Sequence, residues 1–386
     1  MKKNLVFNFI SCSDIVLQKT FPYYIGKIHD MSASIVYRQD AGSLHLPAEH
    51  KGVKLIPLKF RSNGECFSFR GEWYFFWYFF KHAKEIDVLI RHHYSYQTAI
   101  IGWLYKWRNP HGIFHIFCDG YGVWQSLLRD ETKLSIRIKN WFIRQILNKA
   151  GEIADKVSIE LLDIYQFLQK QKPFLKTPEK LILMRWGIDE EVIEASGMQE
   201  IPVAQKENLI ISVGRHGSKQ KNTELLLEAL KKVDLSKGGG YEVVFIGAIE
   251  TIECDFQATI DAFFDENPHL KDKVRFIGAI YDKPTYFDWF NRAKIFVHTA
   301  VYESYGIVIG EAFRFNNYII STDTGCAKEL IAEGMGEIVE NNADDLSRRL
   351  QRVIDGETDI PSIYREKKIN NRSISWENEV LKLGAF

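Results

Sequence analysis

The chain has 386 residues, of which 46% are hydrophobic and 26% charged, a globular composition with room for two domains. Its formal net charge of zero argues against a nucleic-acid-binding protein. No stretch approaches the roughly 20 apolar residues that a membrane-spanning helix needs. Five widely spaced cysteines without a Cys-x-x-Cys pair exclude a zinc ribbon and favour a reduced, cytosolic setting.

The charge is unevenly distributed along the chain. Residues 1–190 contain 27 Lys and Arg against 18 Asp and Glu, a balance of +9. Residues 191–386 contain 23 against 32, a balance of −9. The split favours two domains with different partners, although a chance drift of surface charge explains it equally well.

In the first half, short apolar runs that end in polar or glycine residues predict buried parallel strands. These runs are 5–11, 34–39, 53–59, 87–93, 113–119, 156–160 and 181–187. The first run is too short for a signal-peptide core and is better interpreted as a strand. Helical patterns lie at 94–109 and 131–153, and the aromatic run 73–80 predicts a buried helix face.

The second half repeats the alternation of strands and helices more regularly. We expect strands at 209–214, 242–248, 274–279, 295–300, 318–322 and 336–340, and helices at 222–233, 284–293, 307–315 and 344–355. Strict β–α alternation predicts an α/β fold with two doubly wound parallel sheets. The alternation is lost at 188–207, which is the candidate linker between a first domain, 1–187, and a second domain, 208–371. A closing helix at 372–386 is assigned to the first domain.

The loop after strand 209–214 is rich in basic residues. Arg215 follows Gly214 directly, and Lys219 and Lys221 precede a helix. Cations at a strand end beside a helix N-terminus favour an anion site, and the Arg fork suits phosphate oxygens. A solvated basic loop is an equally open interpretation. The chain contains neither G-x-G-x-x-G after the first strand nor a P-loop, which argues against a nicotinamide dehydrogenase or a P-loop NTPase.

Two glutamates stand eight positions apart in 302-YESYGIVIGEAF-313. In one continuous helix they would lie about 12 Å apart along the axis and could not serve one small group. A helix that begins near Gly306 instead leaves Glu303 in the loop and puts Glu311 about a turn and a half inside. The amides of 306–308 would then face an anion.

The segment 318-YIISTDTGCAKELI-331 forms another strand, glycine turn and helix. Gly325 allows the backbone to approach a ligand closely. For Asp323 and Thr324, capping of the following helix is the favoured interpretation.

These motifs together resemble the retaining family-4 glycosyltransferases of the GT-B fold. The resemblance rests on 214-GRHGSKQKN-222, 276-FIG-278, 303-ESYGIVIGEA-312 and 321-STDTGCAKEL-330, and it covers residues 185–340. It implies two Rossmann-like domains that face each other across a cleft. It also implies transfer of a hexose from a UDP- or GDP-sugar with retention of configuration.

The resemblance assigns roles to particular residues. Arg215 and Lys221 correspond to the basic pair that neutralises the departing diphosphate. Glu303 corresponds to the acid beside the transferred sugar, and Glu311 to the acid that binds the ribose hydroxyls. The remaining donor-binding positions are Gly214, Ser304, Tyr305, Gly306 and Ile307.

No metal or cofactor is expected, because the chain has no Asp-x-Asp pair to bridge phosphates. The first half departs from the family: 11-SCSDIVLQKTF-21 lacks the usual glycine pair, and 183-LMRWGID-189 replaces I-P-N-G-V-D. The segment 374–383 resembles the family's closing helix.

Acceptor candidates come from strand ends of the first half. They are Arg91, His92, His93 and Asp119, with Asp119 the candidate general base. A helix cap for Asp119 and packed histidines are alternatives. In retaining transfer the leaving phosphate can accept the acceptor's proton instead.

The amphipathic stretch 133–149 interleaves five basic residues with Trp141, Phe142 and isoleucines. Contact with an anionic membrane is one interpretation, but packing of its apolar face on the domain's own sheet is favoured. The sequence thus predicts a cytosolic, metal-independent, retaining hexosyltransferase of surface-polysaccharide synthesis with a glycan or lipid-linked acceptor. The alternative is a non-catalytic GT-B partner or glycan-binding subunit of a glycosyltransferase complex.

Overall fold

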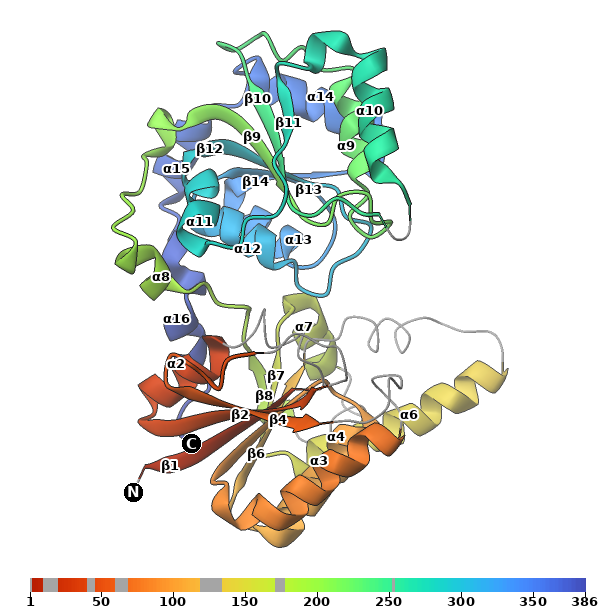
Figure 1. Cartoon of the computed structure of the whole chain (residues 1–386), viewed down its shortest axis with the longest axis vertical. Coiled ribbons are helices and arrows are strands. Elements are labelled where there is room, and N and C mark those ends of the chain that lie inside the picture. Colours follow the sequence, from red (N-terminus) through yellow and green to blue (C-terminus); the bar gives the residue numbers. More distant parts are fainter. Residues whose placement is uncertain are drawn as a thin grey trace. The chain divides into compact units, whose positions relative to one another are not determined.

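The computed structural model describes residues 2–9, 20–39, 46–59, 69–118, 134–170, 178–251 and 254–386. The chain divides into two compact units: unit 1 comprises 1–187 and 376–386, and unit 2 comprises 188–375. Figure 1 shows both, coloured along the chain. Among the sequence candidates, Asp119 lies outside the described residues, as do positions 11–19 of the expected glycine-poor loop.

Unit 1 is built on a sheet whose order, within the described residues, is β3-β4-β2-β1-β5-β6-β7-β8. All neighbouring strands are parallel except the short β3 against β4. The strands are β1 (Lys3–Phe9), β2 (Met31–Gln39), β3 (Glu49–His50), β4 (Val53–Lys59), β5 (Val88–His92), β6 (Ile113–Cys118), β7 (Lys156–Ile159) and β8 (Leu181–Leu183). Each apolar run predicted as a strand in this half forms one, and β3 is an addition.

The longer helices of unit 1 are α2 (Thr20–Ile28), α3 (Phe69–His82), α4 (Tyr96–Arg108), α6 (Leu134–Ile153), α7 (Leu162–Lys170) and α16 (Trp376–Leu381). Helices α3, α4 and α6 lie side by side, with α4 packed against both others (Figure 1). The aromatic run 73–80 lies in α3, where Phe75 and Phe79 are buried as predicted while Trp73 and Trp77 are exposed on the other side.

Helix α16 completes unit 1 from the far end of the chain. It packs on α2, where the Trp376 ring stacks on Phe21 with centroids 5.0 Å apart. Trp376 also contacts Trp186, and a Cβ on Gly187 would lie 2.5 Å from its ring. The buried Glu379 accepts a hydrogen bond from the Arg185 amide at 2.8 Å. Unit 1 is therefore made of two separate stretches of sequence.

The expectation for the amphipathic stretch 133–149 is wrong. Within α6, Leu134, Ile138, Trp141 and Phe142 are all at least half exposed, whereas Ile136 and Ile143 are half-buried. The four exposed side chains therefore do not pack on the sheet of unit 1.

Unit 2 contains a parallel sheet whose described strands have the order β11-β10-β9-β12-β13-β14. The strands are β9 (Glu207–Val213), β10 (Glu242–Ile246), β11 (Val274–Phe276), β12 (Ala293–His298), β13 (Tyr318–Thr322) and β14 (Gly336–Val339). Their central residues, such as Ile210, Val243, Ile295 and Ile320, are buried and form the core. The order reverses between β9 and β12, so the predicted doubly wound architecture is confirmed.

The α-helices in the described part of unit 2 are α8 (Glu190–Ala195), α9 (Thr223–Leu230), α10 (Phe256–Glu266), α11 (Lys283–Arg292), α12 (Ile307–Arg314), α13 (Ala327–Leu330), α14 (Ala343–Ile354) and α15 (Ile360–Lys367). Residues 188–207, expected as a linker, belong to unit 2 and contain α8 and a 3-10 turn at Val203–Gln205.

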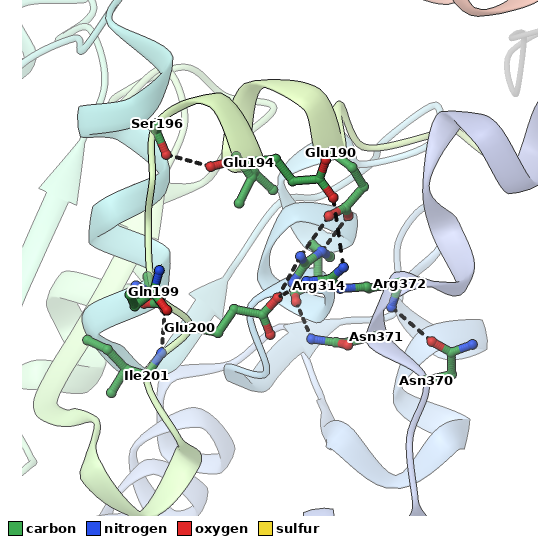
Figure 2. A network of polar contacts seen from close by, with 12 residues as sticks. Glu190, Glu194, Ser196, Gln199, Glu200, Ile201, Arg314, Asn370, Asn371 and Arg372 are labelled. Carbon is green, nitrogen blue, oxygen red and sulfur yellow. Dashed lines mark hydrogen bonds and ion pairs between the residues drawn. The ribbon is translucent and has the colours of Figure 1, made fainter.

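A network of buried ion pairs and hydrogen bonds connects residues 188–207 to α12 (Figure 2). The Arg314 side chain is fully buried and forms a two-pronged ion pair with Glu190; its NH2 group lies 2.7 Å from Glu190 Oε2. The same NH2 donates to Glu200 Oε1 at 2.8 Å, which Arg372 NH2 also reaches at 2.8 Å. Asn371 Nδ2 donates to the Arg314 carbonyl at 2.6 Å. The C-terminal end of α12 is thus held by residues near both ends of unit 2.

Replacement of Arg314 by Met should destabilise unit 2 strongly, because it leaves Glu190 buried without its cation. Removal of one partner of a buried ion pair costs about 3–5 kcal/mol. For a domain of this size this corresponds to a Tm lower by about 10 °C in calorimetry. The matched variant Arg372→Met, at a half-exposed position, should change Tm by only about 1–3 °C. Equal losses in the two variants would contradict a central role of Arg314.

Candidate functional site

The loops after β9 and β12 meet where the strand order of unit 2 reverses. Because β9 and β12 are neighbours and parallel, their carboxyl ends deliver residues 214–222 and 299–306 to the same edge of the sheet. Two hydrogen bonds join these loops: the Val301 amide donates to the Gln220 carbonyl at 2.8 Å, and Thr299 Oγ1 donates to the Lys221 carbonyl at 3.0 Å. The basic loop and the first glutamate of the predicted pair therefore lie together.

Lys221 and Glu303 form an ion pair at this edge. The Lys221 ammonium contacts Glu303 Oε1, and both side chains are largely buried. The same oxygen lies 3.2 Å from His298 Nε2 at the end of β12, and Glu303 Oε2 accepts from Gln220 Nε2 at 3.4 Å. Gly214 leaves room for the Lys221 stem, since a Cβ there would stand only 3.3 Å from it. The Lys221 ammonium, the Gln220 amide and the His298 ring therefore surround the Glu303 carboxylate.

These contacts hold Glu303 in its charged form. Burial alone would raise the pKa of Glu303, but contact with His298 and the charge of Lys221 outweigh it and lower that pKa below its usual value. Burial lowers the pKa of His298, even though Glu303 opposes this effect. A neutral imidazole therefore stands beside an ionised carboxylate.

Helix α12 begins where the sequence predicts. Its N-cap is Gly306, whose φ of 85° lies in the left-handed region that favours glycine. The first hydrogen bond to the cap carbonyl is donated by Ile309, so the amides of Ile307 and Val308 precede the intrahelical ladder. The helix N-terminus thus opens at the loop that carries Glu303.

Gly325 allows a second turn to approach this loop. Its φ is 54°, and a Cβ at this position would lie 2.2 Å from the Tyr305 carbonyl oxygen. The Cys326 amide donates to that carbonyl at 2.7 Å. The close approach that Gly325 allows in the structure is to the loop that carries Glu303, and an approach to a ligand stays a prediction. The expectation that Asp323 or Thr324 caps the next helix is wrong, since the N-cap of α13 is Cys326 and no side chain caps it.

A pocket of about 440 Å³ lies at the carboxyl ends of β12, β13 and β14. It is lined by Ala300, Val301, and residues 322–324 and 338–341. The lining residues Val301 and Thr324 are close in sequence to Glu303 and Gly325, so the pocket adjoins the segments that carry these two residues.

Glu311 lies in the second turn of α12 and is almost fully buried. Its Oε2 accepts a hydrogen bond of 2.5 Å from the Tyr286 hydroxyl, and its Oε1 lies 3.3 Å from the Lys283 ammonium. Burial and the neighbouring carboxylate raise the pKa of Tyr286 well above its ordinary value, so the phenol remains a hydrogen-bond donor. Lys283 is half exposed and lies over the Tyr286 ring.

The other donor-site candidates have diverse environments. The Arg215 side chain is exposed, and its NH2 group donates to Gln220 Oε1 at 3.3 Å, so Gln220 bridges Arg215 and Glu303. Ser304 is exposed, Ile307 is half-buried, and Tyr305 is buried within unit 2.

The candidates in unit 1 are mostly interior. Arg91 is fully buried, reaches Asn8 Oδ1 on β1, and lies over the Phe75 ring. His92 is fully buried and its ring stacks on Phe117 with centroids 5.5 Å apart. His93 is half-buried with φ 68°. The packed-histidine alternative therefore describes His92.

The residues that sequence reasoning missed are the partners of the two glutamates. They are His298, Gln220, Tyr286 and Lys283. His298 could have been noticed as a polar residue at the end of an apolar strand. Lys283 and Tyr286 lie on a helix remote in sequence, and no spacing rule connects them to Glu311.

Residues 196–373, nearly all of unit 2, match the family model described as "Glycosyl transferases group 1". Unit 2 is a glycosyl transferases group 1 domain. The Lys221–Glu303 pair, α12 and Glu311 all lie within the matched range. No curated protein matches the sequence.

Solved structures resemble the chain over nearly its whole length. Sucrose-phosphate synthase from Thermosynechococcus elongatus has a TM-score of 0.69 at 16% identity, covering 99% of this chain and 98% of that one. HepE from Anabaena in complex with UDP and glucose has a TM-score of 0.65 at 15% identity, covering 99% and 98%. The lipopolysaccharide outer core galactosyltransferase WaaB has a TM-score of 0.63 at 13% identity, again covering 99% and 98%. These likenesses establish that the group 1 domain and unit 1 together have the predicted GT-B fold.

The pH dependence of stability tests the environment of Glu303. Because the folded pKa of Glu303 is below the unfolded value of about 4.3, the carboxylate contributes stability above that unfolded value. This contribution is lost as pH falls through the lower folded pKa. Glu303→Gln should therefore lower Tm near neutral pH, and the difference from the wild type should shrink as the solution is acidified toward pH ~3.

The exposed Glu366→Gln serves as the control, with a Tm close to that of the wild type throughout. A Glu303→Gln deficit that stayed constant over the whole pH range would rule out a charge-dependent contribution of this carboxylate.

Proposed function

We propose that the protein is a retaining, metal-independent hexosyltransferase. It would move a hexose from a UDP- or GDP-sugar to a glycan or lipid-linked acceptor in the synthesis of a surface polysaccharide. The observation that carries the proposal is the joint placement of Lys221, Glu303 and the N-terminus of α12 at the strand reversal of a group 1 domain.

The donor diphosphate would lie against this cluster of positive charge. Lys221, the exposed Arg215 and the first amides of α12 supply the cations and dipoles that a diphosphate requires. A phosphate beside Lys221 would share this ammonium with Glu303, while His298 and Gln220 continue to hold the carboxylate. Glu303 would therefore keep its orientation as charge shifts toward the diphosphate.

Glu311 would accept hydrogen bonds from the ribose hydroxyls. Its carboxylate is fixed by the buried Tyr286, whereas its second contact is to the half-exposed Lys283. Lys283 can move aside because its half-exposed ammonium can return to solvent, while the Tyr286 hydroxyl continues to hold the carboxylate. Tyr286 would then position the carboxylate for the sugar.

In the reaction, the bond between the anomeric carbon and the diphosphate oxygen breaks, and its electron pair leaves with the diphosphate. The acceptor oxygen forms the new bond on the same face, and its proton passes to a departing phosphate oxygen. Preorganised cations and amides at the leaving group stabilise this transition state. Glu303 would position the sugar hydroxyls and oppose the positive charge that develops at the anomeric carbon.

The remaining assignments concern the acceptor and the setting of the enzyme. Unit 1 would bind the acceptor, with His93 and Asp119 as the remaining candidates because Arg91 and His92 are fully buried. The enzyme would act in the cytoplasm at the inner face of the membrane. Among the described residues no helix is both long and apolar enough to cross a bilayer. HepE in complex with UDP and glucose, and WaaB, named as a galactosyltransferase, support a nucleotide-sugar donor.

A panel of nucleotides and nucleotide sugars tests the proposal. A true donor present at 100 times its Kd should stabilise the protein by about 2.7 kcal/mol, which raises Tm by several degrees. It should also be hydrolysed slowly, with release of nucleoside diphosphate, and EDTA should change neither result. If no nucleotide raised Tm, the transferase assignment would fail; if EDTA abolished turnover, metal independence would fail.

Glu311→Gln tests the ribose contact. Loss of charge-assisted hydrogen bonds should weaken UDP or GDP binding by about 10- to 100-fold in calorimetric titration. The preference for a ribose over a 2′-deoxyribose nucleotide should fall in parallel. The exposed Glu228→Gln is the matched control. Unchanged discrimination between the two sugars would remove this role from Glu311.

A further inference from the structure

Helices α3, α4 and α6 of unit 1 expose a large set of aromatic side chains. Trp77, Trp103, Trp107 and Trp141 are each between 52% and 58% exposed. With Trp73 and Phe142, which are also exposed, these residues are called the aromatic face. Five of the nine tryptophans of the chain lie on it. Exposed apolar patches of this kind usually mark an interaction site.

The aromatic face is continuous across α3 and α4. The Trp73 and Trp77 rings meet edge to face at 5.9 Å, and Trp77 meets Phe80 at 5.7 Å. Phe80 contacts Trp107 across the two helices at 6.3 Å, and Trp107 stacks with Trp103 at 6.0 Å. Because α6 packs against α4, its exposed Trp141 and Phe142 belong to the same group of helices (Figure 1).

The exposed aromatics are not needed for the core of unit 1. Helix α3 is anchored by the buried Phe75 and Phe79, and α4 by the buried Ile101 and Tyr105. The tryptophans occupy the opposite sides of these helices. Their spacing in the sequence is helical: Trp73 and Trp77 are four residues apart, and so are Trp103 and Trp107.

The same helices carry a strong excess of positive charge. Their sequences contain eight Lys and Arg against two Asp and Glu, a balance of +6. Arg108 combines both properties, since its guanidinium lies 4.8 Å from the Phe80 ring centre and 5.9 Å from that of Trp107. Indole rings favour the boundary between water and lipid, and Lys and Arg favour anionic headgroups. Two copies of this face would instead bring like charges together.

We propose that the aromatic face docks on the surface of an anionic lipid bilayer. The indole rings enter the headgroup boundary, and basic side chains such as Arg137 and Arg144 contact the lipid phosphates. The helices lie on the bilayer and do not cross it. The aromatic face belongs to unit 1 and the donor site to unit 2, so lipid binding and nucleotide binding can be measured independently.

Sedimentation with lipid vesicles tests the proposal on the full chain. The wild type should bind vesicles of phosphatidylcholine and phosphatidylglycerol, bind pure phosphatidylcholine vesicles at least about tenfold more weakly, and lose binding at high salt. The double variant Trp103→Ala/Trp107→Ala should lower affinity by about tenfold or more, through lost apolar burial. Arg137→Glu/Arg144→Glu should have a comparable effect.

Matched variants in unit 2 distinguish specific vesicle binding by the aromatic face from nonspecific adsorption of the protein. Tyr281→Ala removes an aromatic side chain that is 91% exposed, and Arg365→Glu/Lys367→Glu reverses two exposed charges on α15. Both should bind vesicles as the wild type does. Because all altered side chains are exposed, the variants should remain folded and show the wild-type shift of Tm with nucleotide.

Three results would overturn the proposal. The first is that the wild type does not bind anionic vesicles. The second is that the variants of the aromatic face and the unit 2 controls lose vesicle affinity equally. The third is that the tryptophan variant binds vesicles as tightly as the wild type. A dimer in size-exclusion chromatography that Trp103→Ala/Trp107→Ala converts to a monomer, without vesicle binding by the wild type, would assign the face to self-association instead.

Discussion

The reversal of strand order between β9 and β12 is the constraint on which the site in unit 2 depends. The segments that follow β9 and β12 turn to opposite faces of the sheet. Because the two strands are neighbours, the first loop residues of both segments lie beside one another. Lys221 and Glu303, 82 positions apart, meet for this reason. A buried carboxylate and a buried ammonium would each be unfavourable alone, and each makes the other tolerable there.

The two site carboxylates are built in the same way. Glu303 has Lys221 as its cation and the His298 ring as a neutral neighbour, while Glu311 has Lys283 and the Tyr286 hydroxyl. In each case the aromatic partner is buried and comes from a regular element, and the lysine is the more exposed contact. The ring therefore fixes the direction of the carboxylate, and the lysine neutralises it until a polar ligand replaces that contact.

Local patterns were sufficient to predict the strands and the start of α12. Short buried parallel strands are apolar runs with clear ends, and Gly306 marks a backbone conformation that few other residues adopt. The resemblance to a known family supplied the pairing of roles between Glu303 and Glu311. Neither the local patterns nor the resemblance predicted the contacts of Tyr286 and Lys283 with Glu311. These contacts arise from packing of α11 on α12, which no periodicity in the sequence indicates.

The exposed aromatic side chains were beyond sequence reasoning for a different reason. An amphipathic helix such as α6 has an apolar stripe whether that stripe meets a sheet or the solvent. Hydrophobic periodicity identifies the stripe but not its partner. The favoured interpretation of 133–149 failed at this point. Likewise, the loss of alternation at 188–207 suggested a linker, since the pattern could not reveal the contact of Glu190 with Arg314.

The position of α16 has a consequence for the synthesis of the protein. Unit 1 needs Trp376 against Phe21 and Trp186, yet the whole of unit 2 is translated between these residues. At translation rates of about 5–20 residues per second, unit 1 waits roughly 10 to 40 s for its last helix. During that interval the residues of unit 2 are added, while the surface that α16 will cover on α2 remains uncovered. The unit that begins earlier in the chain is therefore the last to be completed.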